Sequence, residues 1–296
     1  MHVESAIRET VLELPRGGEL RFTRGTLRLL GVVNVTPDSF SDGGRFLDPE
    51  RAVEHALRLV DEGADALDLG AESTRPGGGV YGAGAREVPA DEELARLLPV
   101  LERLRPLTSV PLSVDTRKAA VARAALAAGA DLVNDVSALA DPAMAEVVRT
   151  ARCPVILVHS RGELGSMQAR IAFRDVVADV RADLDAARRR ATAAGIDERA
   201  VLLDPGLGFG KTAAQNLALL RATGELAALG APLVVGASRK SFLGAVTGAG
   251  VEARLPGSLA AAAWAAQGGA AMLRVHDVAA TKHFLAVWSA IEDAVR

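Results

Sequence analysis

Polar residues recur at one kind of position in this chain: each closes or follows a short run of aliphatic residues. These positions hold Asn34, Glu72-Ser73-Thr74-Arg75, Asp115, Asn134-Asp135, His159, Asp204, Ser238-Arg239-Lys240 and Arg274-Val275-His276. A single Asp or Asn after a strand is also a common helix cap, so one such residue alone decides nothing. Eight along one chain are much harder to explain by capping, and we expect them to converge on one binding mouth.

This polar set combines two carboxylates with several cations. The carboxylates are Asp115 and Asp204, and the groups able to carry positive charge are Arg75, Lys240, Arg274 and His276. Arg presents a planar fork and Lys a point charge, and both suit a phosphate or diphosphate. A carboxylate suits the flat N–H and NH2 edge of an amino-heterocycle. A ligand with an anionic end and an amino-heterocycle end therefore fits the set; the alternative is a ring of structural salt bridges.

The elements that must position these residues follow from hydrophobic periodicity. Eight short apolar runs predict strands at residues 28–35, 66–70, 111–115, 132–135, 155–159, 201–204, 233–236 and 272–276. Helices are predicted near 49–62, 91–104, 117–128, 142–150, 174–194, 213–229, 255–267 and 278–294. Strands that are apolar on both faces suit a parallel sheet covered by helices. The eight pairs predict an α/β protein with a single (β/α)8 TIM barrel, and a doubly wound sheet is the alternative.

The same alternation predicts one domain. We expect residues 19–296 to form the barrel and residues 1–18 to be an N-terminal extension. Residues 19–27 are expected to add a short hairpin at the bottom of the barrel. The sequence has no interdomain linker, no low-complexity tract and no close internal repeat, which favours a single domain.

Composition excludes several classes of partner. The 296 residues include 34 Lys and Arg against 37 Asp and Glu, a net charge of −3, whereas nucleic-acid binding needs a clustered excess of cations. The longest apolar stretch, residues 259–273, is shorter than the ~20 residues that cross a bilayer. Residues 1–18 lack the apolar core of a secretory signal, and the single Cys153 fits a reducing compartment. We therefore expect a cytoplasmic protein without nucleic-acid or membrane partners.

Other motifs exclude other chemistries. The string GLGFGKT at residues 206–212 looks like a phosphate loop, but Pro205 occupies the position where that motif needs its first glycine. The five histidines show no paired spacing typical of a zinc site. Ser238 is followed by Arg239 and Lys240, so it lacks the G-x-S-x-G context of a nucleophile. Magnesium stays open, because Mg2+ uses one or two protein oxygens together with substrate phosphates.

Several long strings resemble the dihydropteroate synthase family in order and spacing. GVVNVTPDSFSDGG at residues 31–44 and ESTRPG at residues 72–77 are similar to the family's two signature motifs. Further matches are SVDT at 113–116, VND at 133–135, LDPGLGFGK at 203–211, SRKS at 238–241 and RVHD at 274–277. The resemblance covers residues 29–287, which makes a chance match negligible.

The resemblance implies a (β/α)8 barrel, typically a homodimer, that joins p-aminobenzoate to 6-hydroxymethyl-7,8-dihydropterin diphosphate. The implied products are 7,8-dihydropteroate, on the folate pathway, and diphosphate. Pterin binding is assigned to Asp115, Asn134, Asp204 and Lys240. The diphosphate and its Mg2+ are assigned to Asn34, Thr74, Arg75, Arg274 and His276, with Asn34 touching the metal. The p-aminobenzoate pocket is assigned to Phe40, Pro76, Phe209 and Ser241.

The resemblance also implies which residues are catalytic: Asp115, Lys240, Arg274 and His276. Arg274 and His276 would stabilise charge on the departing diphosphate, and Asp115 would stabilise positive charge on the pterin. Sulfonamides mimic p-aminobenzoate, so we expect the family's usual sensitivity to them. Residues 158–160, Val-His-Ser, depart from the Met-His-Met of many members, a change that alters packing more than chemistry.

Two rival functions are weighed against this one. Methyltetrahydrofolate-binding methyltransferases share the pterin floor of the barrel but do not need the Ser-Arg-Lys and Arg-Val-His strings. A non-catalytic paralogue would be expected to lose parts of the signature motifs or the Lys240 motif, and these are intact. Both comparisons favour the synthase.

Overall fold

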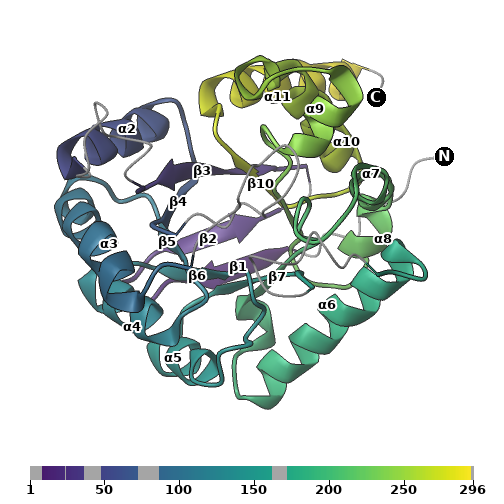
Figure 1. Ribbon diagram of the computed structural model, residues 1–296. Helices are drawn as coiled ribbons and strands as arrows, with labels where there is room; N and C mark the ends of the chain where they lie inside the picture. Colours follow the sequence, from purple (N-terminus) through teal and green to yellow (C-terminus); the bar gives the residue numbers. More distant parts are fainter. Residues whose placement is uncertain (1–8, 24, 37–47, 73–86, 162–171, 295–296) are drawn as a thin grey trace.

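Eight parallel strands form the barrel in the computed structural model (Figure 1), which describes residues 9–23, 25–36, 48–72, 87–161 and 172–294. The strands are β3 (Arg28–Asn34), β4 (Ala66–Gly70), β5 (Leu112–Asp115), β6 (Leu132–Asp135), β7 (Val155–Val158), β8 (Val201–Asp204), β9 (Val234–Val235) and β10 (Met272–Val275). Neighbouring strands pair in parallel, β10 pairs with β3, and a bridge from Leu203 to Leu233 joins β8 to β9. The predicted (β/α)8 barrel is confirmed, and the doubly wound alternative is excluded.

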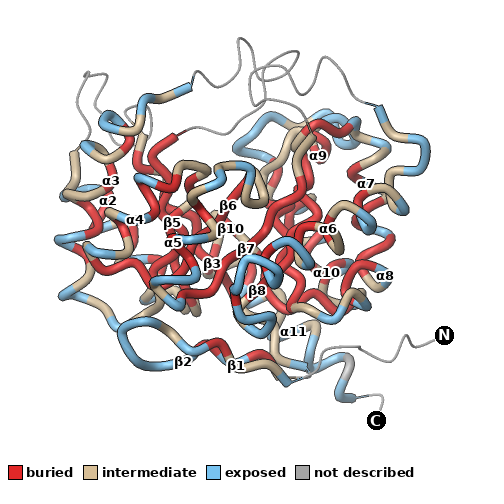
Figure 2. Tube along the Cα trace, turned by 90° about the horizontal axis from the view of Figure 1, so that it is seen from below, coloured by how far each residue is buried: buried red, intermediate tan, exposed pale blue. Residues whose placement is uncertain are grey.

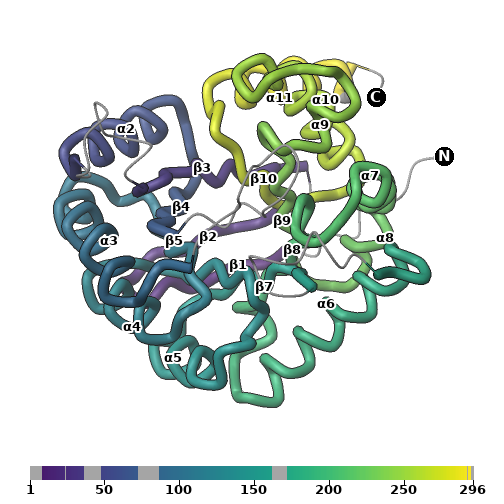
Figure 3. Tube along the Cα trace, viewed as in Figure 1, coloured from purple at the N-terminus to yellow at the C-terminus, as the bar shows by residue number. Residues whose placement is uncertain are grey.

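Helices surround the barrel in chain order (Figure 3). They are α2 (Pro49–Asp61), α3 (Ala90–Leu104), α4 (Ala119–Ala128), α5 (Met144–Ala151), α6 (Val176–Ala193), α7 (Ala213–Arg221), α8 (Thr223–Ala227), α9 (Ser241–Thr247), α10 (Leu255–Gln267) and α11 (Val278–Ala294). Short 3-10 turns are η2 (Arg105–Leu107), η3 (Glu198–Ala200) and η4 (Val251–Ala253). The Asp48 and Asp175 side chains accept N–H groups of the first turns of α2 and α6, and so fix where these helices begin. Within the described ranges, none of the helices has the length and apolar character needed to span a membrane.

Two helical segments differ from the prediction. The helix predicted at 213–229 is interrupted at Ala222, which separates α7 from α8. There the Thr223 hydroxyl donates to the Leu220 carbonyl over 2.6 Å, a local bond that competes with a continuous helix. Helix α9 was not predicted, because its seven residues are too few to show a helical period and Gly248, with a φ of 73°, ends it.

Side chains of each strand point alternately into the barrel and toward the helices. Val33, Leu69 and Val114 point outward and belong to the large core shared with the helices. Leu30 and Ile156 point inward and belong to a separate cluster inside the barrel. The buried band between the two ends of the barrel in Figure 2 contains both clusters.

A β-hairpin closes the bottom of the barrel (Figure 2). Strands β1 (Thr10–Glu13) and β2 (Glu19–Phe22) pair antiparallel, so the hairpin begins earlier than the predicted 19–27 and takes its first strand from the segment 1–18. Leu12, Leu20 and Phe22 are buried in the same cluster as the inward-facing strand residues. The apolar interior is thus filled from below, and the opposite end is left for polar side chains.

Candidate active site

Polar residues face inward at the C-terminal ends of the strands. The strand register places Asn34 and Asp115 on either side of β4, with Asn134 directly beside Asp115. Asp204 ends β8, and Arg274 lies on β10, the neighbour of β3. These five predicted site residues therefore meet at one mouth of the barrel, as active-site residues of such barrels do.

Arg274 bridges two carboxylates inside this mouth. Its Nε donates to Asp68 Oδ2 over 2.6 Å, and its Nη2 donates to Asp115 Oδ2 over 2.8 Å. Burial works against the cation, but attraction by Asp68 and Asp115 holds the pKa of Arg274 above its ordinary value. Arg274 therefore stays charged and brings a fixed cation to the mouth.

For Asp115, burial has a larger effect on the pKa than the attraction of the neighbouring cation. Burial raises the pKa of Asp115 to about 7, although the Arg274 guanidinium favours its charged form. Repulsion from Asp68 and Glu93 adds to the rise, and attraction to Lys240 opposes it. A carboxyl group that changes charge near neutrality, in a mouth with fixed cations, is typical of a catalytic site.

Lys240 reaches the mouth from the turn between β9 and α9. Its Nζ donates to the Leu207 carbonyl and lies 4.4 Å from the centre of the Phe209 ring, a cation–π contact. Burial lowers the pKa of Lys240 to about 8, and attraction to Asp204 opposes this shift. Burial likewise raises the pKa of Asp204, whose Oδ1 accepts the Gly206 N–H over 2.6 Å. An acid, a cation and an aromatic ring thus share one wall of the mouth.

The loop that carries Phe209 is held by the buried Lys211. The Lys211 Nζ donates to the carbonyls of Gly206 and Phe209, both over 2.9 Å, and lies 3.0 Å from His159 Nδ1. Gly206 has a φ of 63°, and a Cβ there would lie 1.8 Å from the His159 carbonyl oxygen, so only glycine fits. Burial lowers the pKa of Lys211 to about 7 and that of His159 to about 4. The glycine-rich residues 206–211 therefore form a fixed loop that holds Phe209 in place.

His276 is oriented by Ser238. The Ser238 Oγ lies 3.1 Å from the ring nitrogen His276 Nδ1 and accepts the backbone N–H of His276 over 3.2 Å. Arg239, between Ser238 and Lys240, has a φ of 57° and donates from Nη2 to Asp277 Oδ1 over 2.6 Å. Ser238 thus positions the imidazole. Ser241 follows at the start of α9 and is half-buried.

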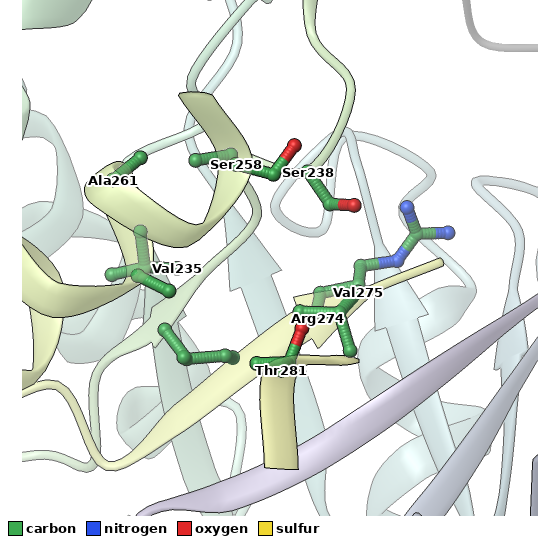
Figure 4. Close-up of a pocket in the computed structure, with 10 residues that line it drawn as sticks. Val235, Ser238, Ser258, Ala261, Arg274, Val275 and Thr281 are labelled. Atoms are coloured by element: carbon green, nitrogen blue, oxygen red, sulfur yellow. The ribbon is translucent and has the colours of Figure 1, made fainter. Parts of the chain in front are cut away.

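A small gap lies between β9, β10 and the helices that cover them, and Ser238 and Arg274 of the mouth are among its lining residues (Figure 4). Val235, Ala261 and Thr281 are among the side chains that line it. The Arg274 guanidinium points away from Val235 and Ala261 in this view. The gap is a packing space between strands and helices, because its lining is mostly small and apolar.

Four predicted site residues lie outside the described part of the chain, and one strand-ending residue, Asp135, caps a turn. Phe40, Thr74, Arg75 and Pro76 lie outside the described residues, so their predicted roles stay predictions. Asp135, which closes β6, caps the following turn: Oδ1 accepts the Ser137 N–H over 2.8 Å, and Oδ2 accepts the Leu139 N–H over 2.7 Å. At this strand end, capping is the correct explanation.

Sequence reasoning missed Asp68 and two glycines that shape the mouth. Asp68 is fully buried in β4, and a charged residue inside the apolar string ALDLG was the available signal. A Cβ at Gly70 would lie 3.3 Å from the Asp115 Cβ. One at Gly236 would lie 3.6 Å from the Arg274 Cβ and 3.8 Å from Asp204 Oδ2. A Cβ at Gly70 would therefore crowd Asp115, and a side chain longer than alanine at Gly236 would enter the space between Arg274 and Asp204.

Together, the fold and the mouth define a (β/α)8 barrel enzyme that binds a nitrogen heterocycle with an anionic group. The mouth joins carboxylates to the fixed Arg274 cation and the Lys240 ammonium, as expected for a flat nitrogen heterocycle that carries an anionic group. Three His, Cys, Asp or Glu side chains grouped to hold a metal do not occur in the part of the chain that the structure describes. Asn34 offers one amide oxygen, which suits a Mg2+ ion brought by substrate phosphates rather than a resident metal.

Comparison with known proteins agrees with this class. Residues 30–276 match the family described as pterin binding enzyme. The chain is 47% identical over 269 residues to a dihydropteroate synthase of Mycobacterium leprae, covering 88% of this chain and 92% of that protein. It is 47% identical over 250 residues to a probable bifunctional folylpolyglutamate synthase/dihydropteroate synthase of Haloferax volcanii, covering 84% of this chain and 29% of that protein.

Solved structures give the same result. The dihydropteroate synthase of Xanthomonas albilineans with 4-aminobenzoic acid has a TM-score of 0.88 and 48% identity, covering 96% of this chain and 99% of that one. The chain therefore belongs to the pterin-binding enzymes and, among them, to the dihydropteroate synthases, which are transferases of folate biosynthesis. Neither the methyltransferase nor the non-catalytic alternative is supported by these relatives.

Proposed function

We propose that this chain condenses 6-hydroxymethyl-7,8-dihydropterin diphosphate with p-aminobenzoate to give 7,8-dihydropteroate and diphosphate. The observation that carries the proposal is the Arg274 bridge between Asp68 and Asp115, which places a fixed cation beside a carboxyl group of raised pKa. The 4-aminobenzoic acid in the Xanthomonas albilineans structure supports the second substrate.

The pterin is assigned to the carboxylate side of the mouth. Asp204 is placed to accept N–H and NH2 groups of the amino-pyrimidine edge, and the Lys240 ammonium is placed to donate to its ring acceptors. Asn134 supplies an amide oxygen from the layer of Asp115. Burial strengthens each of these contacts, because the effective dielectric constant inside a protein is lower than in water.

The diphosphate is assigned to the cationic side. Arg274 and His276 lie on and just after β10, and Asn34 ends the adjacent strand β3. Thr74 and Arg75 complete this set by prediction alone. We propose that Asn34 contributes an oxygen to a Mg2+ ion, which when bound would neutralise charge on the diphosphate oxygens.

The reaction breaks the bond between the pterin methylene carbon and the diphosphate oxygen. The electron pair leaves with the diphosphate, whose growing charge Arg274 and His276 stabilise. The positive charge left on the pterin is delocalised into its ring, where the ionised Asp115 favours it. The arylamine nitrogen of p-aminobenzoate then forms the new C–N bond and loses one proton.

The p-aminobenzoate pocket is assigned to residues beside the fixed loop 206–211. Phe209 packs under the Lys240 ammonium, and Ser241 follows Lys240 directly. Phe40 and Pro76 belong to this pocket by prediction. Inhibition by sulfonamides, which mimic p-aminobenzoate, is expected in the same place.

A homodimer is also proposed, while the cytoplasmic location stays a prediction. Large apolar side chains are exposed on neighbouring helices at one side of the barrel, among them Trp264 on α10 and Val287 and Ile291 on α11. Exposed apolar patches of this kind mark protein interfaces. Analytical ultracentrifugation should show twice the monomer mass, and a monomer at micromolar concentration would contradict the dimer.

The decisive experiment measures diphosphate release by the purified protein with the pterin diphosphate and Mg2+, with and without p-aminobenzoate, while mass spectrometry follows the product. Release accompanied by dihydropteroate is expected. Tight binding of the pterin without either product would indicate a non-catalytic relative. Absence of both binding and product would overturn the assigned ligand.

A further inference from the structure

Asp68 is a buried carboxylate whose contacts all lead to the proposed active site. It lies on β4, is 0% exposed, and one oxygen, Oδ2, accepts two hydrogen bonds. The donors are Arg274 Nε at 2.6 Å and Asn134 Nδ2 at 2.9 Å. A buried charge is costly unless it is paired, so the place and partners of Asp68 are under strong constraint.

The first contact fixes the plane of the Arg274 guanidinium. Asp68 on β4 accepts from Nε, and Asp115 on the adjacent strand β5 accepts from Nη2. The planar fork is held at two separate nitrogens by two acids, which restricts rotation of the guanidinium. Without Asp68, one of these two holds would be lost.

The second contact fixes which way the Asn134 amide points. Its Nδ2 donates to Asp68, so Oδ1 is turned to the other side. Asn134 Oδ1 and Asp68 Oδ1 are both buried and have no hydrogen-bond partner within the described ranges. A buried acceptor without a donor is costly, and it is satisfied when a ligand brings an N–H group.

We propose that Asp68 is a positioning residue, which aligns Arg274 toward the leaving group and presents the Asn134 oxygen to the pterin. This inference rests on the proposed function, since it concerns the same mouth. Asp68 acts through its two neighbours and takes no part in bond making or breaking.

The electrostatic surroundings of Asp115 give a readout that a purely structural role would not move. The charges that act on Asp115 are those of Asp68 on β4, Arg274 on β10, Lys240 in the turn after β9, and Glu93 on α3. Removing the negative charge of Asp68 removes one repulsion and leaves Arg274 to pair with Asp115 alone. Both effects lower the pKa of Asp115, so the acid limb of kcat/KM should move to lower pH.

The test compares Asp68→Asn with Asp131→Asn as a matched control. Asp131 is also a buried carboxylate, at 3% exposed, and accepts from Arg105 Nη1 over 2.8 Å, but it precedes β6 at the end of the barrel opposite the mouth. Calorimetry with the pterin diphosphate measures Kd, and steady-state rates from pH 5.5 to 9 measure kcat/KM. For Asp68→Asn we expect Kd to rise about tenfold and the acid limb to move down by roughly one pH unit.

Asp131→Asn should keep the wild-type Kd and acid limb. A folded Asp68→Asn variant with the wild-type Kd and the wild-type acid limb would overturn the proposal. Equal changes of Kd and acid limb in the two variants would overturn it as well. If Asp68→Asn does not fold, Asp68→Ser removes the same charge and keeps a small acceptor; failure of both to fold would assign Asp68 a structural role only. Absence of turnover by the wild type would instead refute the proposed function, and the Kd comparison would still report on Asp68.

Discussion

Replacing Asp115 by asparagine should make the protein more stable at pH 8 and much slower as an enzyme. The folded pKa of this carboxyl is about 7, against an ordinary value of 3.8. Burial therefore disfavours the charged form even with the Arg274 Nη2 at 2.8 Å from Oδ2. Asparagine has nearly the same shape and no charge, so it avoids this cost.

The size of the effect follows from the two pKa values. A difference of about 3 units, at about 1.4 kcal/mol each, corresponds to on the order of 4 kcal/mol. Because the folded pKa is raised, the stability that comes from the protonated Asp115 is full below pH 3.8 and is lost as pH rises to about 7. The advantage of Asp115→Asn should therefore be small at pH 4, grow through pH 5 and 6, and level off above pH 7.

Urea unfolding of both proteins at pH 4, 6 and 8 measures this difference. In parallel, kcat/KM of the wild type should fall about tenfold from pH 8 to pH 6, as the ionised fraction of Asp115 falls. The variant should lose most turnover and this part of the pH dependence. A variant no more stable than the wild type at pH 8, or a gap independent of pH, would refute the electrostatic reasoning; near-wild-type turnover would refute the catalytic role.

Three further predictions concern other parts of the molecule. Lys240→Ala should weaken pterin binding by about tenfold or more, because it removes a half-buried cation that is attracted to Asp204. Unchanged affinity in a calorimetric titration would contradict this. Gly236→Leu should abolish pterin binding without unfolding the barrel. Gly236→Ala should change the Kd little, since its Cβ would meet ordinary contacts at 3.6 Å or more. Equal Kd values for the two variants would count against the assigned binding site. Phe22→Ala should lower the free energy of unfolding by about 3–5 kcal/mol and leave the Kd for the pterin unchanged, and urea titration together with calorimetry would expose the opposite outcome.

The barrel could be predicted because its information is local. Each strand is buried on both faces and reads as a short apolar run, and its helix reads as a periodic segment, so eight pairs were visible without knowledge of the fold. The hairpin was placed too late, although residues 15–18, Pro-Arg-Gly-Gly, are a turn signal between two alternating strings. The unpredicted α9 follows the left-handed Arg239, and its seven residues carry no period to detect.

The mouth was predictable only in part, because its contacts are not local. Strand ends identified Asp115, Asn134, Asp204 and Arg274, since position along a strand can be read from the sequence. The partner of Asp68 could not be identified in this way: Arg274 is 206 residues away, and only closure of the barrel brings the two together. The same limit applies to Asp135, whose role as a turn cap depends on the path of the chain after β6.

The interior of the barrel is divided between stability and binding. Its lower half is apolar and is completed by Leu12, Leu20 and Phe22 of the hairpin, so it excludes water and stabilises the fold. The opposite half contains charges whose burial is unfavourable, including an Asp115 that is partly neutral at pH 7. Acceptors without partners, at Asp68 Oδ1 and Asn134 Oδ1, lie at the same end. A ligand that brings N–H groups and charge to this end supplies the interactions that the described residues lack. Its binding energy therefore comes from the end of the barrel where buried acceptors have no donor.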